Sequence, residues 1–318
     1  MKRKLLISLI VIVAAIMPLL ITNNFLLRFA TDIIIFAILA SAWNIIGGYT
    51  GYASFGNVVF FGIGAYATAI LMSNAGFSFL VAFVGSGIIA ALFACLMGLP
   101  ILRLKGHYFA IATLGVAEAI KALVQNLDIT EGNAGMYLPP PELSIDHLYH
   151  FFFYFSLVLL IGLIVLTRLI LRRRLGYAMM AIREDEDAAR SLGINTTKTK
   201  VIAFAISAFF TGLAGSLYAY QQGFIKPEPV FKVITTIKMI VMSVFGGLGS
   251  LFGPILGAIS IEVISELLSD LFLVAHTLFL GIIIILTILF APKGLIDIFK
   301  NKRLGKPYFL KNFRKHKL

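Results

Sequence analysis

The sequence predicts an all-α protein, a polytopic transmembrane helical bundle of about ten helices. Two observations carry this prediction. Hydrophobic residues make up 59% of the 318 residues and charged residues only 13%, with a mean hydropathy of +0.96. A soluble domain has no interior large enough to hide that much apolar surface. The apolar residues also gather in segments of the length that a helix needs to cross a bilayer, about 17–25 residues.

Ten apolar segments are long enough to cross or nearly cross the hydrocarbon core. The eighth is short, and the ninth and tenth are barely separated, so a count of eight or nine spans stays open. The first segment follows three basic residues, as in a signal peptide. No small-x-small cleavage site comes after it, so we expect a retained span. The segments lie near residues 5–22, 31–47, 55–73, 78–102, 107–125, 150–171, 201–220, 232–246, 251–268 and 270–290.

Basic residues are distributed unevenly between the two sides of the predicted bundle. With the N-terminus inside and an even number of spans, the inside segments hold 21 of the 27 Lys and Arg residues. The longest outside loop, 126–149, has four acidic residues and no basic one. By the positive-inside rule, both termini and the 172–200 loop are expected in the cytoplasm. The inside basic residues are Lys2, Arg3, Lys4, Arg103, Lys105, those of the 172–200 loop and those from Lys293 to Lys317.

The charge pattern also bounds the domain organisation. We expect a single transmembrane domain over residues 1–298, which includes the cytoplasmic 172–200 loop, and a basic cytoplasmic tail over 299–318. The net charge of +12 comes mainly from the loops and this tail, which argues against nucleic acid as a partner. The single cysteine, Cys95, excludes an intrachain disulfide and any multi-cysteine metal site.

Two glycine-rich stretches, 47–66 and 246–257, each lie where two predicted spans meet. The first carries six glycines, and the second carries five together with Pro254. Small residues let neighbouring helices approach closely, which would make these stretches packing surfaces. Glycine and proline also interrupt the broken helices that line transport pathways. Both interpretations stay open from the sequence.

Motifs for catalysis and for tight metal binding are missing from the sequence. It has no Gly-x-x-x-x-Gly-Lys-[Ser/Thr] phosphate-binding loop and no His-Glu-x-x-His. His147 and His150, beside Asp146, are spaced so that both could ligate a metal from one helical face, but two interfacial histidines before the sixth span are the favoured explanation. With so few histidines, no Ser-His-Asp arrangement can be argued. We therefore predict no catalytic residues, no metal and no cofactor.

Three charged residues fall within predicted spans: Glu118, Lys238 and Glu262. Each costs about 2.5–3.5 kcal/mol near a helix centre, so each should face protein or water. We expect Lys238, which lies mid-span, to have Glu118 or Glu262 as its partner. The three form either an ion pair that fixes helix packing or the polar lining of a pathway. Asn57, in the first glycine-rich stretch, is a further candidate for the lining.

The 172–200 loop stands out because it is charged and helix-forming in a chain built for lipid. It starts with three arginines, and residues 183–187 are five consecutive charges. The spacing of Ile182, Ala189 and Leu192 predicts one short amphipathic helix, which Gly193 would end in a left-handed conformation. This helix either contacts something outside the membrane or is a solvated connector. The candidate contact residues are Arg183, Glu184, Asp185, Asp187, Ala188, Ala189, Leu192 and Gly193.

At these residues the chain resembles a known family. Asp187-Ala188-Ala189-x-x-x-Gly193 resembles the Glu-Ala-Ala-x-x-x-Gly loop of bacterial ABC importers, with Asp in place of Glu. The fuller match is to the permease subunits of branched-chain amino acid ABC importers, and specifically to the longer of the two paralogous permeases. It covers most of residues 40–295, and its most specific segments are 48–66, 102–111, 181–194, 246–257 and 291–295.

The resemblance implies a fold, partners and a mechanism. The fold would be that of the cobalamin-type importers, in a bacterial inner membrane. The loop helix would be a coupling helix that docks in a groove on a separate ATPase subunit, since this chain has no ATP site of its own. Two permeases, either paralogs or copies, would enclose the pathway. An extracytoplasmic binding protein would deliver a branched-chain or related amino acid.

Departures from the family pattern leave the substrate open. The outer loop reads Thr130-Glu131-Gly132-Asn133-Ala134-Gly135-Met136, where the family often has Gly-Gly-Ser/Ala-x-Gly, and Lys238 stands where an acid is commoner. Close relatives of the family carry urea or amides. A secondary transporter, driven by an ion gradient through acids such as Glu118, is the other alternative. A membrane enzyme is disfavoured by the missing motifs.

Overall fold

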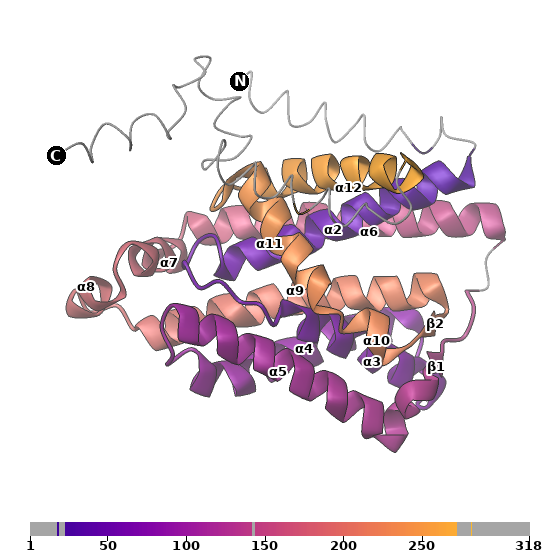
Figure 1. Ribbon diagram of the computed structural model, residues 1–318, viewed down its shortest axis with the longest axis horizontal. Helices are drawn as coiled ribbons and strands as arrows, with labels where there is room; N and C mark the ends of the chain where they lie inside the picture. The colour runs from indigo at the N-terminus through magenta and orange to yellow at the C-terminus, as the bar shows by residue number, and fades with distance from the viewer. Residues whose placement is uncertain (1–17, 19–22, 142–143, 272–280, 282–318) are drawn as a thin grey trace, which may run out of the picture.

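A computed structural model describes Pro18, residues 23–141, residues 144–271 and Gly281. Most of its long helices run roughly along the long axis of the molecule (Figure 1). They are α2 (Asn24–Ile46), α3 (Asn57–Ser73), α4 (Phe79–Ile101), α5 (His107–Asn126), α6 (Ile145–Leu171), α9 (Thr196–Gln222), α11 (Val233–Gly247) and α12 (Gly253–Leu271). The short helices are η1 (Asp128–Thr130), η2 (Gly132–Ala134), α7 (Arg174–Glu184), α8 (Glu186–Ser191) and α10 (Pro227–Val230).

Within the described ranges, six helical segments are long and apolar enough to cross a membrane. They are α2, α4, α5, α6, α9 and the combined segment Pro227–Gly247. Helix α3 is apolar but shorter, and α12 covers the predicted segment near 251–268. The predicted spans near 5–22 and 270–290 and the 299–318 tail lie outside the described residues, apart from Pro18, 270–271 and Gly281. The prediction of a multi-pass helical membrane protein is confirmed.

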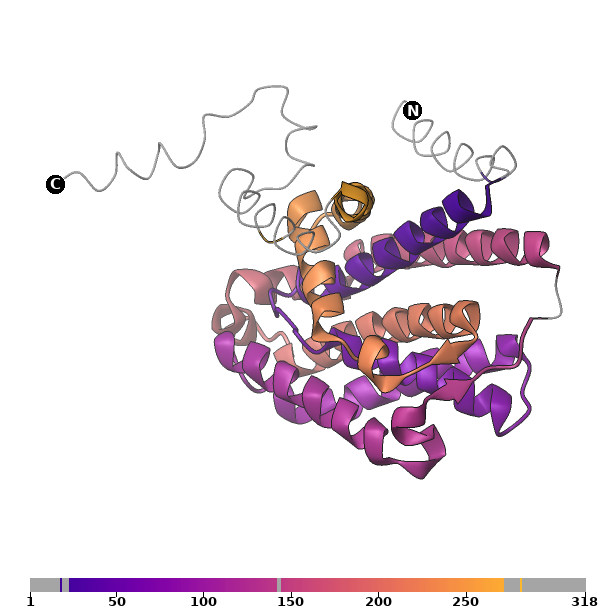
Figure 2. The same cartoon turned by 45° about the vertical axis from the view of Figure 1, so that its right-hand side comes forward.

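Helix α9 lies at the centre of the bundle. It packs against α2 and α6 on one side and against α3 and α4 on the other (Figures 1 and 2). Glycines make this packing close: a Cβ on Gly64 would clash with the carbonyl oxygen of Gly212, and one on Gly215 would clash with that of Phe61. Helices α3 and α9 can therefore approach to backbone contact, as small residues allow in membrane proteins.

The second glycine-rich stretch joins α11 to α12 in the same way. A Cβ on Gly246 would meet the carbonyl oxygen of Gly253, and one on Gly257 would meet that of Met242. At these positions, and at Gly64, the glycines serve helix packing. Gly51 and Gly249, at the turns of the two stretches, lie instead against the side chain of Arg183.

The prediction of an all-α protein needs one small correction. Strands β1 (Met136–Tyr137) and β2 (Phe224–Ile225) form an antiparallel ribbon, with Met136 opposite Ile225. The ring centroids of Tyr137 and Phe224 lie 4.4 Å apart across this ribbon. Two residues per strand are too few to leave a period of two in the sequence, which is why the ribbon was missed.

The two ends of the bundle carry different loops. The ribbon, η1 and η2 lie at one end, and α7 and α8 lie at the other (Figure 1). The acidic 126–149 loop and the arginine-rich 172–200 loop are thus separated by the length of the bundle, as the predicted topology requires. Which end faces the cytoplasm stays a prediction from the positive-inside rule.

Candidate functional site

The 172–200 loop folds as two helices, so the prediction of a single loop helix is wrong. Helix α7 ends at Glu184, and α8 begins at Glu186. Between them Asp185 has an extended backbone, and its Oδ1 accepts hydrogen bonds from the amides of Asp187 and Ala188 at 2.8 and 2.9 Å. Asp185 is therefore the N-cap of α8 rather than a residue in its first turn.

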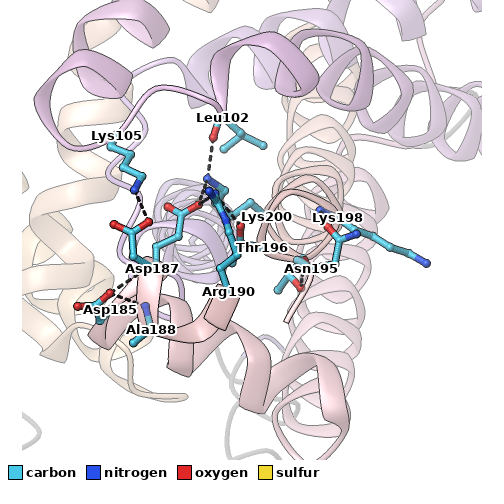
Figure 3. A network of polar contacts seen from close by, with 12 residues as sticks. Leu102, Lys105, Asp185, Asp187, Ala188, Arg190, Asn195, Thr196, Lys198 and Lys200 are labelled. Carbon is cyan, nitrogen blue, oxygen red and sulfur yellow. Dashed lines mark hydrogen bonds and ion pairs between the residues drawn. The ribbon is translucent and has the colours of Figure 1, made fainter. Parts of the chain in front are cut away.

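A buried charge network attaches α8 to the transmembrane bundle. Lys200 Nζ, at the start of α9, lies 2.8 Å from Glu186 Oε1, and the two side chains are only 3% and 9% exposed. The ammonium also donates to the carbonyl oxygen of Leu102 at 2.7 Å and to the hydroxyl of Tyr52 at 2.9 Å. Figure 3 shows Lys200 reaching toward Leu102. The Tyr52 hydroxyl in turn donates to Glu186 Oε2.

This network satisfies both charges, which is the condition for burying an ion pair without a large penalty. Burial raises the pKa of the Glu186 carboxyl, but hydrogen bonds from Lys200 and Tyr52 and the charge of Lys200 outweigh it. The net result is a pKa below the ordinary value, so the carboxylate stays ionised. Burial also raises the pKa of Tyr52, so its hydroxyl keeps the proton that it donates. We call Tyr52, Leu102, Glu186 and Lys200 the α8 clamp.

Exposed pairs surround the α8 clamp. Lys105 Nζ lies 2.7 Å from Asp187 Oδ1, and this hydrogen bond lowers the pKa of the Asp187 carboxyl (Figure 3). Arg190 contacts both Glu186 Oε1 and Thr196 Oγ1 at 3.4 Å. Because exposed pairs are screened by water, they orient α8 but stabilise it much less than the clamp does.

Helix α7 is attached to the bundle through Arg183. Its Nη1 donates to the carbonyl oxygen of Gly48 at 2.7 Å. A Cβ on Gly249 would clash with the same Nη1, and one on Gly51 would lie 3.3 Å from Arg183 Cγ. Arg183 therefore lies against the turns of both glycine-rich stretches, and only residues without a side chain leave room for it there.

Asn44, at the end of α2, joins the same two turns from inside. Its Nδ2 donates to the carbonyl oxygen of Ser250 at 3.0 Å, and its Oδ1 accepts from the amide of Gly249 at 2.9 Å. Gly249 has a φ of 71°, a conformation that glycine adopts without strain. The turn after α2, the turn before α12 and the end of α7 thus form one contact region.

The residues of α8 divide into an inner and an outer set. Ala189 is 2% exposed and packs into the core of its own chain, whereas Ala188 is exposed. Leu192 is 82% exposed, so the prediction that it shares a buried face with Ile182 and Ala189 is wrong. The break at Asp185 changes the helical register between them. The exposed predicted contact residues are Arg183, Glu184, Asp185, Asp187, Ala188, Leu192 and Gly193, the last with a φ of 84°.

Lys238 has the acidic partner that the insertion cost of a mid-span ammonium predicted. Its Nζ lies 3.1 Å from Glu262 Oε1 and 4.8 Å from the centroid of the Phe36 ring. Glu118, the other candidate, is not its partner: it lies 3.9 Å from Lys121, and its side chain is 58% exposed. The Lys238–Glu262 pair joins α11 to α12, which fits the packing interpretation.

Asn57 and the two histidines have local contacts. Asn57, the first residue of α3, is fully buried, and its Nδ2 donates to Ser207 Oγ of α9 at 3.0 Å. This is a packing contact, and a role for Asn57 in the pathway stays a prediction. His147 Nδ1 lies 2.6 Å from Ser144 Oγ, and His150 Nε2 lies 3.3 Å from the carbonyl oxygen of Pro18.

Sequence reasoning missed several residues of this region: Asn44, Tyr52, Glu186 and Lys200. Lys200 gave the clearest signal, because it stands directly before the apolar run 201–220 and would enter the core with it. A buried lysine is almost always paired with an acid, and the nearest acids in the sequence are those of the charged run 183–187.

Comparison with known proteins gives the family. The family model described as the permease component of the branched-chain amino acid transport system matches residues 25–290. The permease protein LivM of the high-affinity branched-chain amino acid transport system is 34% identical, in both Salmonella typhimurium and Escherichia coli K12, over 323 aligned residues. The match covers 93% of this chain and 75% of each relative.

The permease protein LivH from E. coli K12 is 25% identical over 284 residues, covering 82% of this chain and 91% of the relative. No solved structure gives a significant match. The family model spans the described helices from α2 to α12 and includes the whole 172–200 loop. The chain belongs to the family of branched-chain amino acid transport permeases.

Proposed function

We propose that this chain is a transmembrane subunit of an ABC importer for branched-chain or related amino acids. The family match and the printed names of LivM and LivH support the substrate class and the import system. The pathway would be enclosed with a second permease subunit, in a fold of the cobalamin-importer type. An extracytoplasmic binding protein would deliver the substrate.

Energy would come from separate ATPase subunits that bind the exposed side of α8. The sequence has no phosphate-binding loop, so ATP hydrolysis needs another chain. In this arrangement the 172–200 loop and both termini lie in the cytoplasm, residues 1–298 form the permease domain and 299–318 form a cytoplasmic tail. A cysteine at Asn195 would then resist an impermeant thiol reagent in intact cells, and one at Asn133 would react.

The α8 clamp is the observation that favours this function. A force on a short surface helix moves the transmembrane helices only if the attachment between them is stiff. The buried Glu186–Lys200 pair fixes α8 to α9, and Arg183 fixes α7 to the turns beside α2 and α12. A displacement of α8 would therefore move the helices instead of bending the loop. A secondary transporter does not need such an attached element on its surface.

Reconstitution tests the function directly. The chain would be co-expressed with a paralogous permease and a candidate ATPase, placed in liposomes and supplied with the binding protein. We expect ATP-dependent uptake of labelled leucine. Uptake that follows an imposed ion gradient without ATP would support the secondary transporter. Uptake of urea but not of leucine would assign the complex to the urea and amide group.

A further inference from the structure

Helices α5 and α10 expose a cluster of charges on the side of the bundle away from α2. Lys121 Nζ lies 2.8 Å from Glu228 Oε2 of α10 and 3.9 Å from Glu118 Oε2 of α5. The side chains of Glu118 and Glu228 are 58% and 66% exposed. The cluster thus presents both signs of charge within a few ångströms, and much of it is open to whatever lies beside the chain.

The depth of this cluster excludes lipid as its neighbour. Helix α5 is a candidate span of 20 residues, and Glu118 lies about 2 Å from its midpoint at 1.5 Å per residue. A charged side chain at that depth almost always faces the bundle interior or a water-filled cavity. Among the described residues none covers the Glu118 carboxylate, which fits a second subunit, with water between, on that side of α5.

The backbone beside the cluster leads to the same conclusion independently. Between α9 and α11 the chain passes through β2, the single turn α10 and an extended Lys232. The Lys121–Glu228 contact places α10 roughly 8 Å inside the end of α5. Irregular backbone at membrane depth is tolerated only inside protein or beside a water-filled cavity. Since Glu228 and Pro229 are exposed in this chain, a second subunit or a water-filled cavity must lie beside them.

The exposed side of α5 also has room for a neighbouring helix. A Cβ on Gly115 would meet no atom within 4 Å, and Ala119 and Ala122 are exposed on the same side of the helix. Small residues such as these let a helix of a neighbouring subunit approach α5 closely. Helix α5 also exposes apolar residues such as Ile111 and Leu123, but unlike the exposed side of α4, with Leu92 and Leu96, it adds the Glu118 carboxylate.

We propose that Glu118, Lys121 and Glu228 line the aqueous translocation pathway, at the interface that a second permease subunit closes. This inference rests on the proposed function and adds the position of the pathway. It also favours one ligand chemistry, a small zwitterion. Its carboxylate would pair with Lys121 and its ammonium would lie between Glu118 and Glu228, so that the ammonium replaces the cation that the two carboxylates now share. A neutral amide offers no such exchange.

Cysteine accessibility tests the position of the pathway. In a Cys95→Ser background, Ala119→Cys lies one residue from Glu118, and Leu92→Cys on α4 is the matched control for a lipid-facing position. A cysteine thiolate attacks a charged methanethiosulfonate reagent to form a mixed disulfide and release methanesulfinate, and the thiolate forms in water and not in lipid. In the assembled importer we expect Ala119→Cys to react, with protection by leucine and its binding protein, and Leu92→Cys to stay unlabelled. An Ala119→Cys variant that is as unreactive as Leu92→Cys overturns the inference.

Uptake kinetics test the ligand chemistry in the same complexes. Lys121→Gln removes the only cation of the cluster, and we expect the KM for leucine uptake to rise about tenfold or more, as when a hydrogen bond to a charged group is lost. Leu92→Ala should leave the KM unchanged. An unchanged KM in Lys121→Gln overturns the zwitterion site. If the unmodified complex transports leucine, either negative result refutes this inference alone; if it transports nothing, the proposed function fails first.

Discussion

Arg183 Nη1 donates a 2.7 Å hydrogen bond to the carbonyl oxygen of Gly48, which ties the end of α7 to the turn after α2. The same guanidinium lies against Gly249, and Asn44 joins the two turns from the other side. One side chain of the 172–200 loop therefore contacts the ends of two pairs of bundle helices. Any movement of α7 reaches α2, α3, α11 and α12 through this contact region.

Substitution of Arg183 should separate ATP hydrolysis from transport. In Arg183→Gln the charge and the fork of donors are lost, and we expect uptake by the reconstituted importer to fall about tenfold, the scale of one lost charged hydrogen bond. ATP hydrolysis should continue, because α8 keeps its clamp. Arg172→Gln, an exposed arginine of the same loop, is the control and should transport normally. Equal loss of hydrolysis and uptake in Arg183→Gln would contradict a coupling role.

The α8 clamp should behave as a buried ion pair in a double-mutant cycle. Lys200→Met leaves the Glu186 carboxylate buried without its cation, which typically costs about 3–5 kcal/mol. We expect a clear fall in the unfolding temperature of the purified protein, and partial recovery when Glu186→Gln is added. Lys105→Met, which removes only an exposed pair, should hardly change that temperature. No recovery in the double variant would mean that the two residues do not stabilise each other.

The stability of the protein should depend on pH through Glu186. Its pKa in the folded protein is lower than the ordinary value of 4.5, so the folded state favours the ionised form. Its contribution is therefore complete above pH 4.5 and is lost as the pH falls through the lower folded pKa. Unfolding temperatures followed from neutral pH downward should fall less steeply in Glu186→Gln than in the parent. Identical profiles would show that this carboxylate is not the group that titrates.

Sequence reasoning was most successful where the signal is a long-range pattern. Apolar length located the long helices α2 to α6, α9, α11 and α12, and the insertion cost of a lone ammonium predicted an acidic partner for Lys238. The cost alone could not choose between Glu118 and Glu262, because helix contacts across the bundle leave no local trace in the sequence. The fold was therefore predictable at the level of spans, and pairings between helices were not.

The 172–200 loop shows why local reading fails in a charged segment. Acids are favoured both at an N-cap and in the first turn of a helix, so Asp185 was compatible with one continuous helix or with a break. The break at Asp185 changes the helical register of the residues that follow, so the side chain of Leu192 points outward. Arg183 was predicted as a contact residue, but its inward hydrogen bond to Gly48 depends on a turn more than a hundred positions away.

Lys238 and Glu262 should stabilise the packing of α11 on α12 as a pair. Lys238→Met leaves the buried Glu262 carboxylate without its cation, and we expect lower expression and a lower unfolding temperature. Adding Glu262→Gln should restore part of the loss, because the two groups are 3.1 Å apart. Adding Glu118→Gln instead should restore nothing, since Glu118 contacts Lys121. Rescue by Glu118→Gln would contradict the pairing.

The outer side of α8 is the expected docking surface for the ATPase, and two neighbouring alanines separate docking from folding. Ala189 is buried in its own chain, so Ala189→Trp would overfill the core and displace α8 whether or not an ATPase binds there. Ala188 is exposed, and a tryptophan at that position should leave the clamp and the spans intact.

We therefore expect Ala188→Trp to insert into the membrane normally but to lose association with the ATPase in a pull-down, and to lose ATP-dependent uptake with it. Leu127 is exposed and directly follows α5, whose C-terminal end lies at the end of the bundle away from α8 (Figure 1), so Leu127→Trp should keep the ATPase bound. Because the bulk is added at one exposed position of α8, lost association would locate the docking surface at that position. Normal association and uptake in Ala188→Trp would show that α8 is only a connector between α7 and α9.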